Sequence, residues 1–380
     1  MMAPHEATSR TEPRPEALRT ELRRAMAGDV GAPLSDSRFN DLALRVFAHQ
    51  FGANAPYGAF CRSRGRTPDS VLSWTEVPVV PTTAFKRLSL VAGRTEDAAV
   101  TFRTSGTTGG EGDRGEHHVL DLELYHASLL SSFRRHLLPD GRPMPILALV
   151  PSPESQPSSS LSHMAGTVMD ASAAPGSGYW VDPDHGLNVA GFREAATRVI
   201  SDGSPALVFG TAFSFVHLID ALEGTGGTLV LPRGSRVMET GGFKGRSREM
   251  SPAELYSGIG RALGIAPQWI VNEYGMTEML SQFYDGVAGA VGESRIHHPP
   301  PWVRSRVLDP ISLEPVAEGE TGLLCHFDLA NVDSVSGVLT EDLGMASEGG
   351  LRLLGRASGA EPRGCSIAMD DLLAAAGRIK

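Results

Sequence analysis

A run of hydroxyl-bearing residues and glycines at positions 104–110 has the composition of a phosphate-binding loop. Glycine lets backbone N–H groups turn toward an anion without a Cβ atom in the way, and serine and threonine hydroxyls supply further donors. The run lacks the lysine of a Walker A loop, so it indicates a different kind of nucleotide site. The same composition also occurs in ordinary surface loops. The candidate residues are Thr104, Ser105, Gly106, Thr107, Thr108 and Gly109.

A second polar stretch, 272–278, follows the apolar residues 269–271 at the end of an expected strand. Tyr274 offers a flat face to a purine, and Thr277 offers a hydroxyl to a phosphate. Glu278 supplies a hard oxygen of the kind that Mg²⁺ prefers. Gly275 completes this combination of an aromatic ring, a glycine, a hydroxyl and a carboxylate within five residues. The alternative is a strand end with a solvated glutamate, but the two stretches together favour a site for ATP and Mg²⁺.

The two stretches resemble the phosphate loop and the Y-G-x-T-E segment of the adenylate-forming superfamily, which includes acyl-CoA synthetases and adenylation domains. Residues 340–342 lie where that superfamily has T-G-D, and Gly355-Arg356 lies where it has G-R. Residues 78–86, 239–245 and 363–366 are similar to the acyl-protein synthetase (LuxE-type) branch, whose members serve fatty-acid reductase complexes. The likeness covers about residues 78–373, most of the chain.

This resemblance implies attack of a carboxylate on the α-phosphorus of ATP, with pyrophosphate as the leaving group. Such a reaction depends on alignment and on dispersal of negative charge. The loop at 104–109 would hold the β- and γ-phosphates, Thr277 the α-phosphate and Glu278 the metal ion. Asp342 would accept hydrogen bonds from the ribose hydroxyls. Arg356 would bind the ribose or a phosphate.

Three further residues, Gly241, Gly242 and Lys244, lie in one of the stretches that carry the resemblance. The two glycines would let the backbone approach the adenine, and Lys244 would neutralise phosphate. The simpler alternatives are a tight turn for the glycines, a solvated lysine, a turn carboxylate at Asp342 and a surface ion pair at Arg356.

Cys365 occupies the place of the cysteine that carries the acyl group in the resembling acyl-protein synthetases. Arg363 lies two residues before it, and a nearby guanidinium favours the nucleophilic thiolate. The alternative is an inert structural cysteine. Larger relatives have a mobile C-terminal domain with a late lysine, for which the stretch after Arg356 is too short. We therefore expect a shortened end at 356–380 instead of that domain.

Composition describes an ordinary globular protein, with 41% hydrophobic and 21% charged residues. The formal net charge of −10 argues against nucleic-acid partners. No apolar run is long enough for a membrane span, and the polar N-terminus does not resemble a signal peptide. Three widely spaced cysteines give no disulfide or zinc pattern, which favours the cytoplasm. The adjacent pairs His117-His118 and His297-His298 are expected in loops rather than on a metal ion.

Hydrophobic periodicity predicts an α/β fold with mainly parallel sheets flanked by helices, and parallel sheets place ligands at the carboxyl ends of strands. We expect a disordered lead-in at 1–14, a large adenylation core at 15–300 and a β-rich subdomain at 301–355. The expected helices are 15–26, 36–51, 121–138, 192–201, 213–222, 252–263 and 369–375. The expected buried strands include 146–150, 206–209, 228–231 and 269–271.

These features favour an enzyme that activates a fatty or related hydrophobic acid and transfers the acyl group to a thiol. The acceptor could be Cys365, CoA or a carrier protein, and an acyl reductase is an expected partner. One alternative is a ligase for a small aromatic or polyketide acid of secondary metabolism. Another is a non-catalytic nucleotide-binding scaffold, against which Thr277, Glu278 and Asp342 argue.

Overall fold

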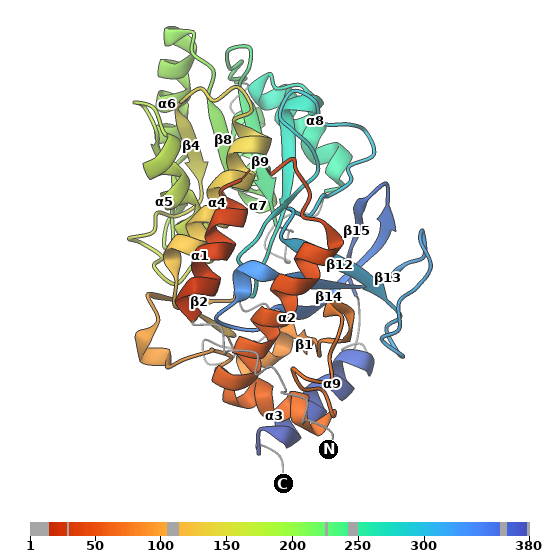
Figure 1. The fold of residues 1–380 in the computed structure, drawn as a ribbon. Helices are drawn as coiled ribbons and strands as arrows, with labels where there is room; N and C mark the ends of the chain where they lie inside the picture. The colour runs from red at the N-terminus through yellow and green to blue at the C-terminus, as the bar shows by residue number, and fades with distance from the viewer. Residues whose placement is uncertain are drawn as a thin grey trace, which may run out of the picture.

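The computed structural model describes residues 15–28, 30–104, 114–224, 227–241, 250–357 and 363–377. Within these ranges the fold is built on a six-stranded and a five-stranded sheet (Figure 1). The six-stranded sheet and its helices occupy the upper part of the molecule in that view, and the five-stranded sheet lies below it. The α/β architecture predicted from the sequence is thus confirmed.

The six-stranded sheet is parallel except at one edge. Its parallel strands, in spatial order, are β5 (Gly178–Tyr179), β4 (Ile146–Leu149), β8 (Leu207–Thr211), β9 (Arg236–Thr240) and β10 (Ile270–Tyr274). The short strand β11 (Phe283–Tyr284) pairs antiparallel with β10. The carboxyl ends of the parallel strands therefore meet at one edge, where ligands bind in such sheets.

Helices cover both faces of this sheet, which explains why its strands are almost continuously apolar. Successive residues of a strand face opposite sides. One set packs with α6 (Val189–Asp202), α7 (Ala212–Gly224) and α8 (Pro252–Leu263): it includes Leu147, Val208, Val237 and Ile270. The other set joins the main core with α4 (Leu122–Leu137) and α5 (Ser160–Ser172): it includes Ile146, Leu207, Met238 and Val271.

The five-stranded sheet is formed mostly by the later part of the chain. Strands β12 (Val303–Leu308), β13 (Gly322–Asp328), β14 (Gly337–Ser347) and β15 (Gly350–Arg356) pair antiparallel. The short strand β1 (Val80–Pro81) pairs parallel with β14. Because Val271 of one sheet and Phe327 of the other belong to the same buried cluster, the two sheets share a hydrophobic core. The domain boundaries expected from the sequence stay predictions.

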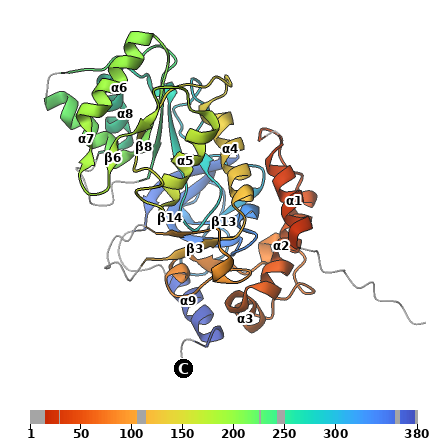
Figure 2. The ribbon, with the colours of Figure 1, turned by 90° about the vertical axis from the view of Figure 1, so that its left-hand side faces the viewer.

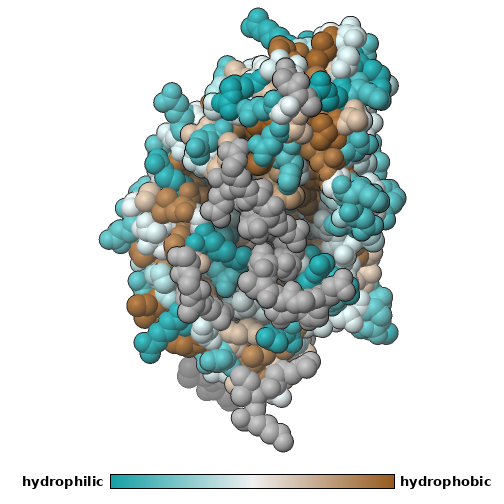
Figure 3. Space-filling model, turned by 180° about the vertical axis from the view of Figure 1, so that it is seen from behind, coloured by the Kyte–Doolittle hydropathy of each residue, from teal (hydrophilic) through white to brown (hydrophobic). Residues whose placement is uncertain are grey.

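The N-terminal helices α1 (Pro15–Met26), α2 (Asp36–Ala53) and α3 (Ala55–Ser63) form one side of the molecule (Figure 2). Helix α9 (Arg363–Ala375) packs on α3 and β1. Two small antiparallel pairs complete the fold: β2 (Val100–Arg103) with β3 (Glu116–Val119), and β6 (Val181–Asp182) with β7 (Gly186–Leu187). On the face shown in Figure 3, hydrophilic and hydrophobic residues are interspersed over the described part of the surface.

Local signals explain most of the helix positions. Helix α8 begins at a capping box, in which Ser251 and Glu254 satisfy each other's backbone N–H groups, and it covers the predicted 252–263. The Asp121 side chain accepts a hydrogen bond from the backbone N–H of Leu124 (3.0 Å), as expected for an N-cap of α4. Among the described residues, none of the helices is both long and apolar enough to cross a membrane.

Three predictions about individual segments are wrong. Residues 228–231 form no strand, because the N–H groups of Leu229 and Leu231 bond to carbonyls in the last turn of α8. The sheet strand in this part of the chain is β9. The C-terminal helix begins at Arg363, so Cys365 lies in its first turn. His117 and His118 are not in a loop, because residues 116–119 pair with β2 as a strand, and both side chains are buried.

Candidate active site

The strands β2 and β3 form the base of the predicted phosphate loop. The Thr104 N–H donates to the Gly115 carbonyl (2.9 Å), and the Gly115 N–H donates to Thr104 Oγ1 (2.8 Å). These two bonds extend the β2–β3 pairing by one step and bring the two ends of the loop together. The predicted loop residues Ser105, Gly106, Thr107, Thr108 and Gly109 lie outside the described residues.

The second motif begins where β10 ends. Tyr274 is the last residue of the strand, and 275–281 form an irregular turn at the carboxyl edge of the parallel sheet. Gly275 fits here because a Cβ atom would collide with the Glu273 carboxylate. Thr277 and Glu278 are half-buried. The Thr277 hydroxyl lies 3.3 Å from that of Ser160, in the first turn of α5.

A histidine joins the two motifs. The carbonyl of Thr277 accepts a hydrogen bond from Nδ1 of His117, which follows the phosphate loop on β3, at 2.7 Å. Burial lowers the pKa of His117 to about 4, so its imidazole is neutral near pH 7. Because a carbonyl only accepts, the proton of this neutral ring lies on Nδ1. Segments 160 residues apart in the sequence thus meet at one place.

Tyr274 lies at the centre of a hydrogen-bond chain between the two sheets. Its hydroxyl donates to Oδ2 of Asp342 on β14 (2.9 Å) and lies 3.3 Å from Nε2 of His326 on β13. Nδ1 of His326 lies 2.8 Å from the Ser305 hydroxyl. Burial lowers the pKa of His326 to about 3, so the ring is neutral. The chain therefore runs from Ser305 through His326 and Tyr274 to Asp342, and it brings Asp342 next to the second motif.

The other candidate residues are positioned less directly. Arg356 on β15 is paired in register with Asp342, but its exposed guanidinium donates to the Glu341 carboxylate. Gly241, just after β9, has a φ of 73°, which is a left-handed conformation that favours glycine. Gly242 and Lys244 lie outside the described residues.

Cys365 is buried in a small apolar cluster with side chains of β12, β13 and β14. Its sulfur lies 3.9 Å from the carbonyl of Thr340, two residues before Asp342. Gly364 permits this packing, since a Cβ atom there would collide with Leu313. The proposed acceptor thiol thus contacts the backbone of the strand that contains the proposed ribose carboxylate, and it is shielded from solvent.

Two buried carboxyl groups at the ends of β9 and β10 were not singled out from the sequence. Glu239 accepts from the Asn272 side-chain amide and from the Tyr256 hydroxyl, and Glu273 accepts from the Thr240 hydroxyl. Burial raises the pKa of Glu239 to about 8 and that of Glu273 to about 7. The signal was present, since each glutamate interrupts an apolar strand within a motif.

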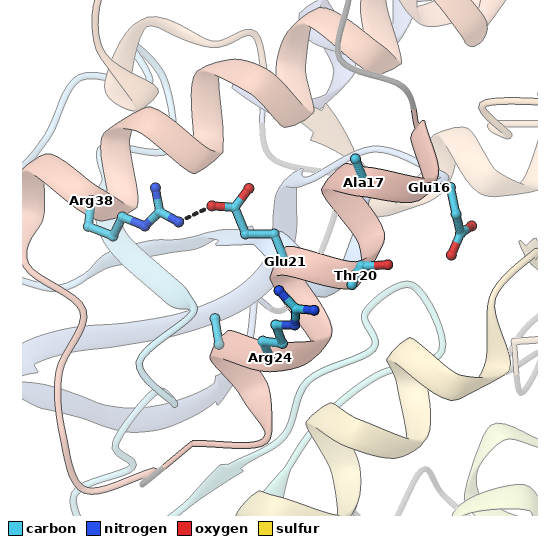
Figure 4. A pocket seen from close by; sticks show the side chains of 7 residues that line it. Glu16, Ala17, Thr20, Glu21, Arg24 and Arg38 are labelled. Atoms are coloured by element: carbon cyan, nitrogen blue, oxygen red, sulfur yellow. Dashed lines mark hydrogen bonds and ion pairs between the residues drawn. The ribbon is translucent and has the colours of Figure 1, made fainter.

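A separate surface hollow of about 710 Å³ lies beside α1 and α2 (Figure 4). It contains none of the motif residues. Glu21 in this hollow forms ion pairs with Arg38 and Arg45, which lower the pKa of its carboxyl group. We therefore assign the site to the edge where the two motifs meet.

Comparison with solved structures identifies the fold as that of adenylate-forming ligases. The chain matches 2-hydroxyisobutyryl-CoA ligase in complex with 2-HIB-AMP with a TM-score of 0.59 and 14% identity, covering 94% of this chain and 72% of the ligase. It also matches an open conformation of that ligase in complex with 2-HIB-AMP and CoA. The TM-score, the identity and the coverage of this chain are the same, and the match covers 80% of the ligase.

Residues 34–374 match the model of the acyl-protein synthetase, LuxE, family, so the chain belongs to that family. The family predicted from the sequence is thereby confirmed. Two relatives are long-chain-fatty-acid–luciferin-component ligases. That of Aliivibrio fischeri is 45% identical over 51 residues, 13% of this chain and 14% of the relative. That of Vibrio harveyi is 29% identical over 83 residues, 22% of this chain and 20% of the relative. The matched stretches therefore span less than a quarter of either relative.

Proposed function

We propose that this protein activates a fatty or related hydrophobic carboxylic acid with ATP and Mg²⁺ and transfers the acyl group to a thiol. The observation that carries the proposal is the 2.7 Å contact between His117 and the Thr277 carbonyl, which joins the base of the phosphate loop to the second motif. The names of the two luciferin-component ligases support a fatty acid as substrate.

In the proposed first step, a carboxylate oxygen of the acid attacks the α-phosphorus of ATP, and the bond to pyrophosphate breaks. Thr104 and the rest of the phosphate loop would hold the β- and γ-phosphates, and the Thr277 hydroxyl would bind the α-phosphate. Lys244 would add positive charge. The Thr277 hydroxyl suits this role because its contact in the described residues is another hydroxyl, which phosphate can replace or join.

The nucleoside would be held at the junction of the two sheets. Asp342 would accept hydrogen bonds from the ribose hydroxyls, with Tyr274, Gly241 and Gly242 against the adenine and Arg356 at the rim. The Glu278 carboxylate, half-buried on the same turn as Thr277, would hold Mg²⁺, which neutralises phosphate charge when bound.

In the second step a thiolate sulfur attacks the acyl carbon, the bond from that carbon to the phosphate oxygen breaks, and AMP leaves. We propose Cys365 as the acceptor, because its sulfur lies beside Thr340 in the segment that contains Asp342. Since Cys365 is buried, acylation requires α9 to shift and expose the thiol. An acyl reductase in the cytoplasm would then take over the acyl group.

Acid-dependent exchange of pyrophosphate into ATP tests the first step. We expect exchange with a saturated long-chain acid and none without an added acid. Binding of ATP with no exchange across a panel of fatty, aromatic and polyketide acids would contradict the proposed activity. Exchange with an aromatic acid alone would replace the proposed substrate class.

Mass spectrometry of the intact protein after incubation with ATP and the acid tests the acceptor. We expect one acyl adduct in the wild type and none in Cys365→Ala, with pyrophosphate exchange retained. Cys325, which is buried in the same cluster, provides the control Cys325→Ala, which should keep the adduct. An adduct that persists in Cys365→Ala, or acyl transfer to CoA or a carrier protein alone, would exclude Cys365 as acceptor.

A further inference from the structure

The turn that contains Thr277 and Glu278 is held by side chains of distant elements. Residues 275–281 form no regular secondary structure, so their backbone groups lack the partners that a helix or strand would give them. Buried backbone N–H and carbonyl groups need hydrogen bonds from elsewhere. For this turn, buried residues at and just after the end of β13 provide them.

Asp328, the last residue of β13, is fully buried behind the turn. Its Oδ2 accepts from the backbone N–H of Leu280 (3.2 Å), and its Oδ1 accepts from the Ser281 hydroxyl (2.7 Å). Oδ1 also accepts from the backbone N–H of Ala330 (2.9 Å), the residue just before Asn331. Asp328 therefore ties two residues of the turn to the start of the segment that follows β13.

Asn331 is also fully buried, and its amide can take only one orientation. Nδ2 donates to the carbonyls of Glu278 (2.8 Å) and Val335 (3.1 Å), while Oδ1 accepts from the Leu280 N–H (3.0 Å). Reversing the amide would put an oxygen against two carbonyls. The carbonyl of Glu278 is thus bonded from behind by Asn331, just as that of Thr277 is bonded by His117.

The pleat of β13 relates this support to the rest of the site. His326 and Asp328 are two residues apart, so they point to the same face of the strand. His326 contacts the Tyr274 hydroxyl before the turn, and Asp328 contacts Leu280 and Ser281 at its end. One strand of the second sheet therefore fixes both ends of the turn that leaves the first sheet.

We propose that Asp328 and Asn331 are positioning residues for the adenylation reaction: they fix the backbone of the 277–281 turn so that Thr277 and Glu278 are held in place for the α-phosphate and the metal ion. Neither residue is required to touch a substrate. The proposal rests on the function proposed above, and it adds two residues to the site that the motifs do not contain.

Paired asparagine variants test this role. Asn331→Ala removes the bonds to the turn. Asn54→Ala is the matched control, because Asn54 is equally buried and bonds to the Ser334 carbonyl (3.2 Å) and the Tyr57 N–H (3.2 Å), but not to the turn. Both variants lose stability, and both are assayed well below their unfolding temperatures.

We expect Asn331→Ala to lower kcat of pyrophosphate exchange about 10- to 100-fold with the KM for the acid nearly unchanged. We expect Asn54→Ala to retain the wild-type kcat.

Hydrogen exchange of the ligand-free protein provides a readout that does not depend on activity. Deuterium uptake in peptides that cover 275–282 should rise in Asn331→Ala and stay at the wild-type level in Asn54→Ala. If Asn331→Ala does not fold, the near-isosteric Asn331→Asp is used instead. It keeps an oxygen that accepts from the Leu280 N–H, but it has an oxygen in place of the NH₂ group that donates to the Glu278 carbonyl. Its pyrophosphate exchange and its deuterium uptake are measured in the same way.

The positioning role would be overturned if the folded Asn331 variant kept the wild-type kinetics of pyrophosphate exchange and the wild-type deuterium uptake in residues 275–282. An equal fall in kcat in Asn54→Ala would also overturn it. An inactive wild type would contradict the proposed function, whereas the hydrogen-exchange result would still decide whether Asn331 holds the turn.

Discussion

Buried carboxyl groups lie on two sides of the candidate site, and their surroundings differ. Asp328, behind the 275–281 turn, accepts hydrogen bonds from two backbone N–H groups and one hydroxyl. Glu273, at the end of β10, accepts from the Thr240 hydroxyl. Glu239, at the end of β9, accepts from the Asn272 amide and, at 3.4 Å, from the Tyr256 hydroxyl.

The difference appears in their pKa values. Burial raises all three, but the donors around Asp328 limit its pKa to about 6, whereas Glu273 reaches about 7 and Glu239 about 8. Near pH 7 Asp328 is therefore mostly ionised, and Glu239 is mostly protonated. The carboxylate that holds the turn is therefore ionised to a greater extent at pH 7 than the carboxyl group of Glu239.

The largest effect is expected from Asp328→Ala. The change removes the Asp328 acceptor of the Ala330 N–H and of the Ser281 hydroxyl, whereas the Leu280 N–H keeps its bond to Asn331 Oδ1. Each buried group left without an acceptor costs about 1–3 kcal/mol, so we expect the free energy of unfolding, measured with urea at pH 7, to fall by about 2–6 kcal/mol. A loss below about 1 kcal/mol would mean that the carboxylate does not hold these groups.

Glu273→Gln should change how stability depends on pH. The folded-state pKa of Glu273 is raised from 4.5 to about 7, so the folded state holds a proton that the unfolded state releases. Wild-type stability therefore falls as the pH rises from 4.5 to 7, and the glutamine variant lacks this contribution. From pH 4.5 to pH 7, the free energy of unfolding of the variant should therefore rise relative to that of the wild type by on the order of 2 kcal/mol. A destabilisation by the amide that is the same at every pH does not affect this comparison. Parallel curves of unfolding temperature against pH for the wild type and the variant would contradict the prediction.

Tyr274→Phe tests the hydrogen-bond chain between the two sheets. The change removes the donor to Asp342 and the partner of His326, and we expect a loss of about 1 kcal/mol. Tyr256→Phe is the matched control, because its longer bond to Glu239 should be worth less. Equal losses in urea denaturation would show that the Tyr274 hydroxyl has no special role in stability.

The smallest effect is expected from Glu239→Gln at pH 6. The carboxyl group is protonated at that pH, and glutamine retains an acceptor for the Asn272 amide. The free energy of unfolding should change by less than about 1 kcal/mol. A larger loss at pH 6 would indicate that Glu239 is ionised there, which would remove its contrast with Asp328.

The sequence predicted the local features of this fold well. Apolar periodicity and caps located α1 and α8 with their observed bounds, and residue types alone drew attention to Tyr274, Thr277 and Glu278. The strand expected at 228–231 failed because its leucines are buried without pairing in the sheet. Burial and strand pairing are different properties, and an apolar run reports only the first.

The sequence could not predict the residues that support the site from a distance. Asn331 contacts the Glu278 carbonyl from 53 positions away, and His117 contacts Thr277 from 160 positions away. A buried asparagine and a buried histidine have no local pattern that distinguishes them from exposed ones. Their partners follow from the way β3 and β13 approach the carboxyl edge of the other sheet.

The burial of the Cys365 side chain between α9 and the five-stranded sheet has a chemical consequence for the thiol. A reagent such as iodoacetamide can reach the sulfur only in molecules whose α9 is displaced, so the alkylation rate is set by the population of that open form. The same shielding protects the thiol from peroxide. The alkylation rate of Cys365 would thus report how often the C-terminal helix leaves its place on α3 and β1.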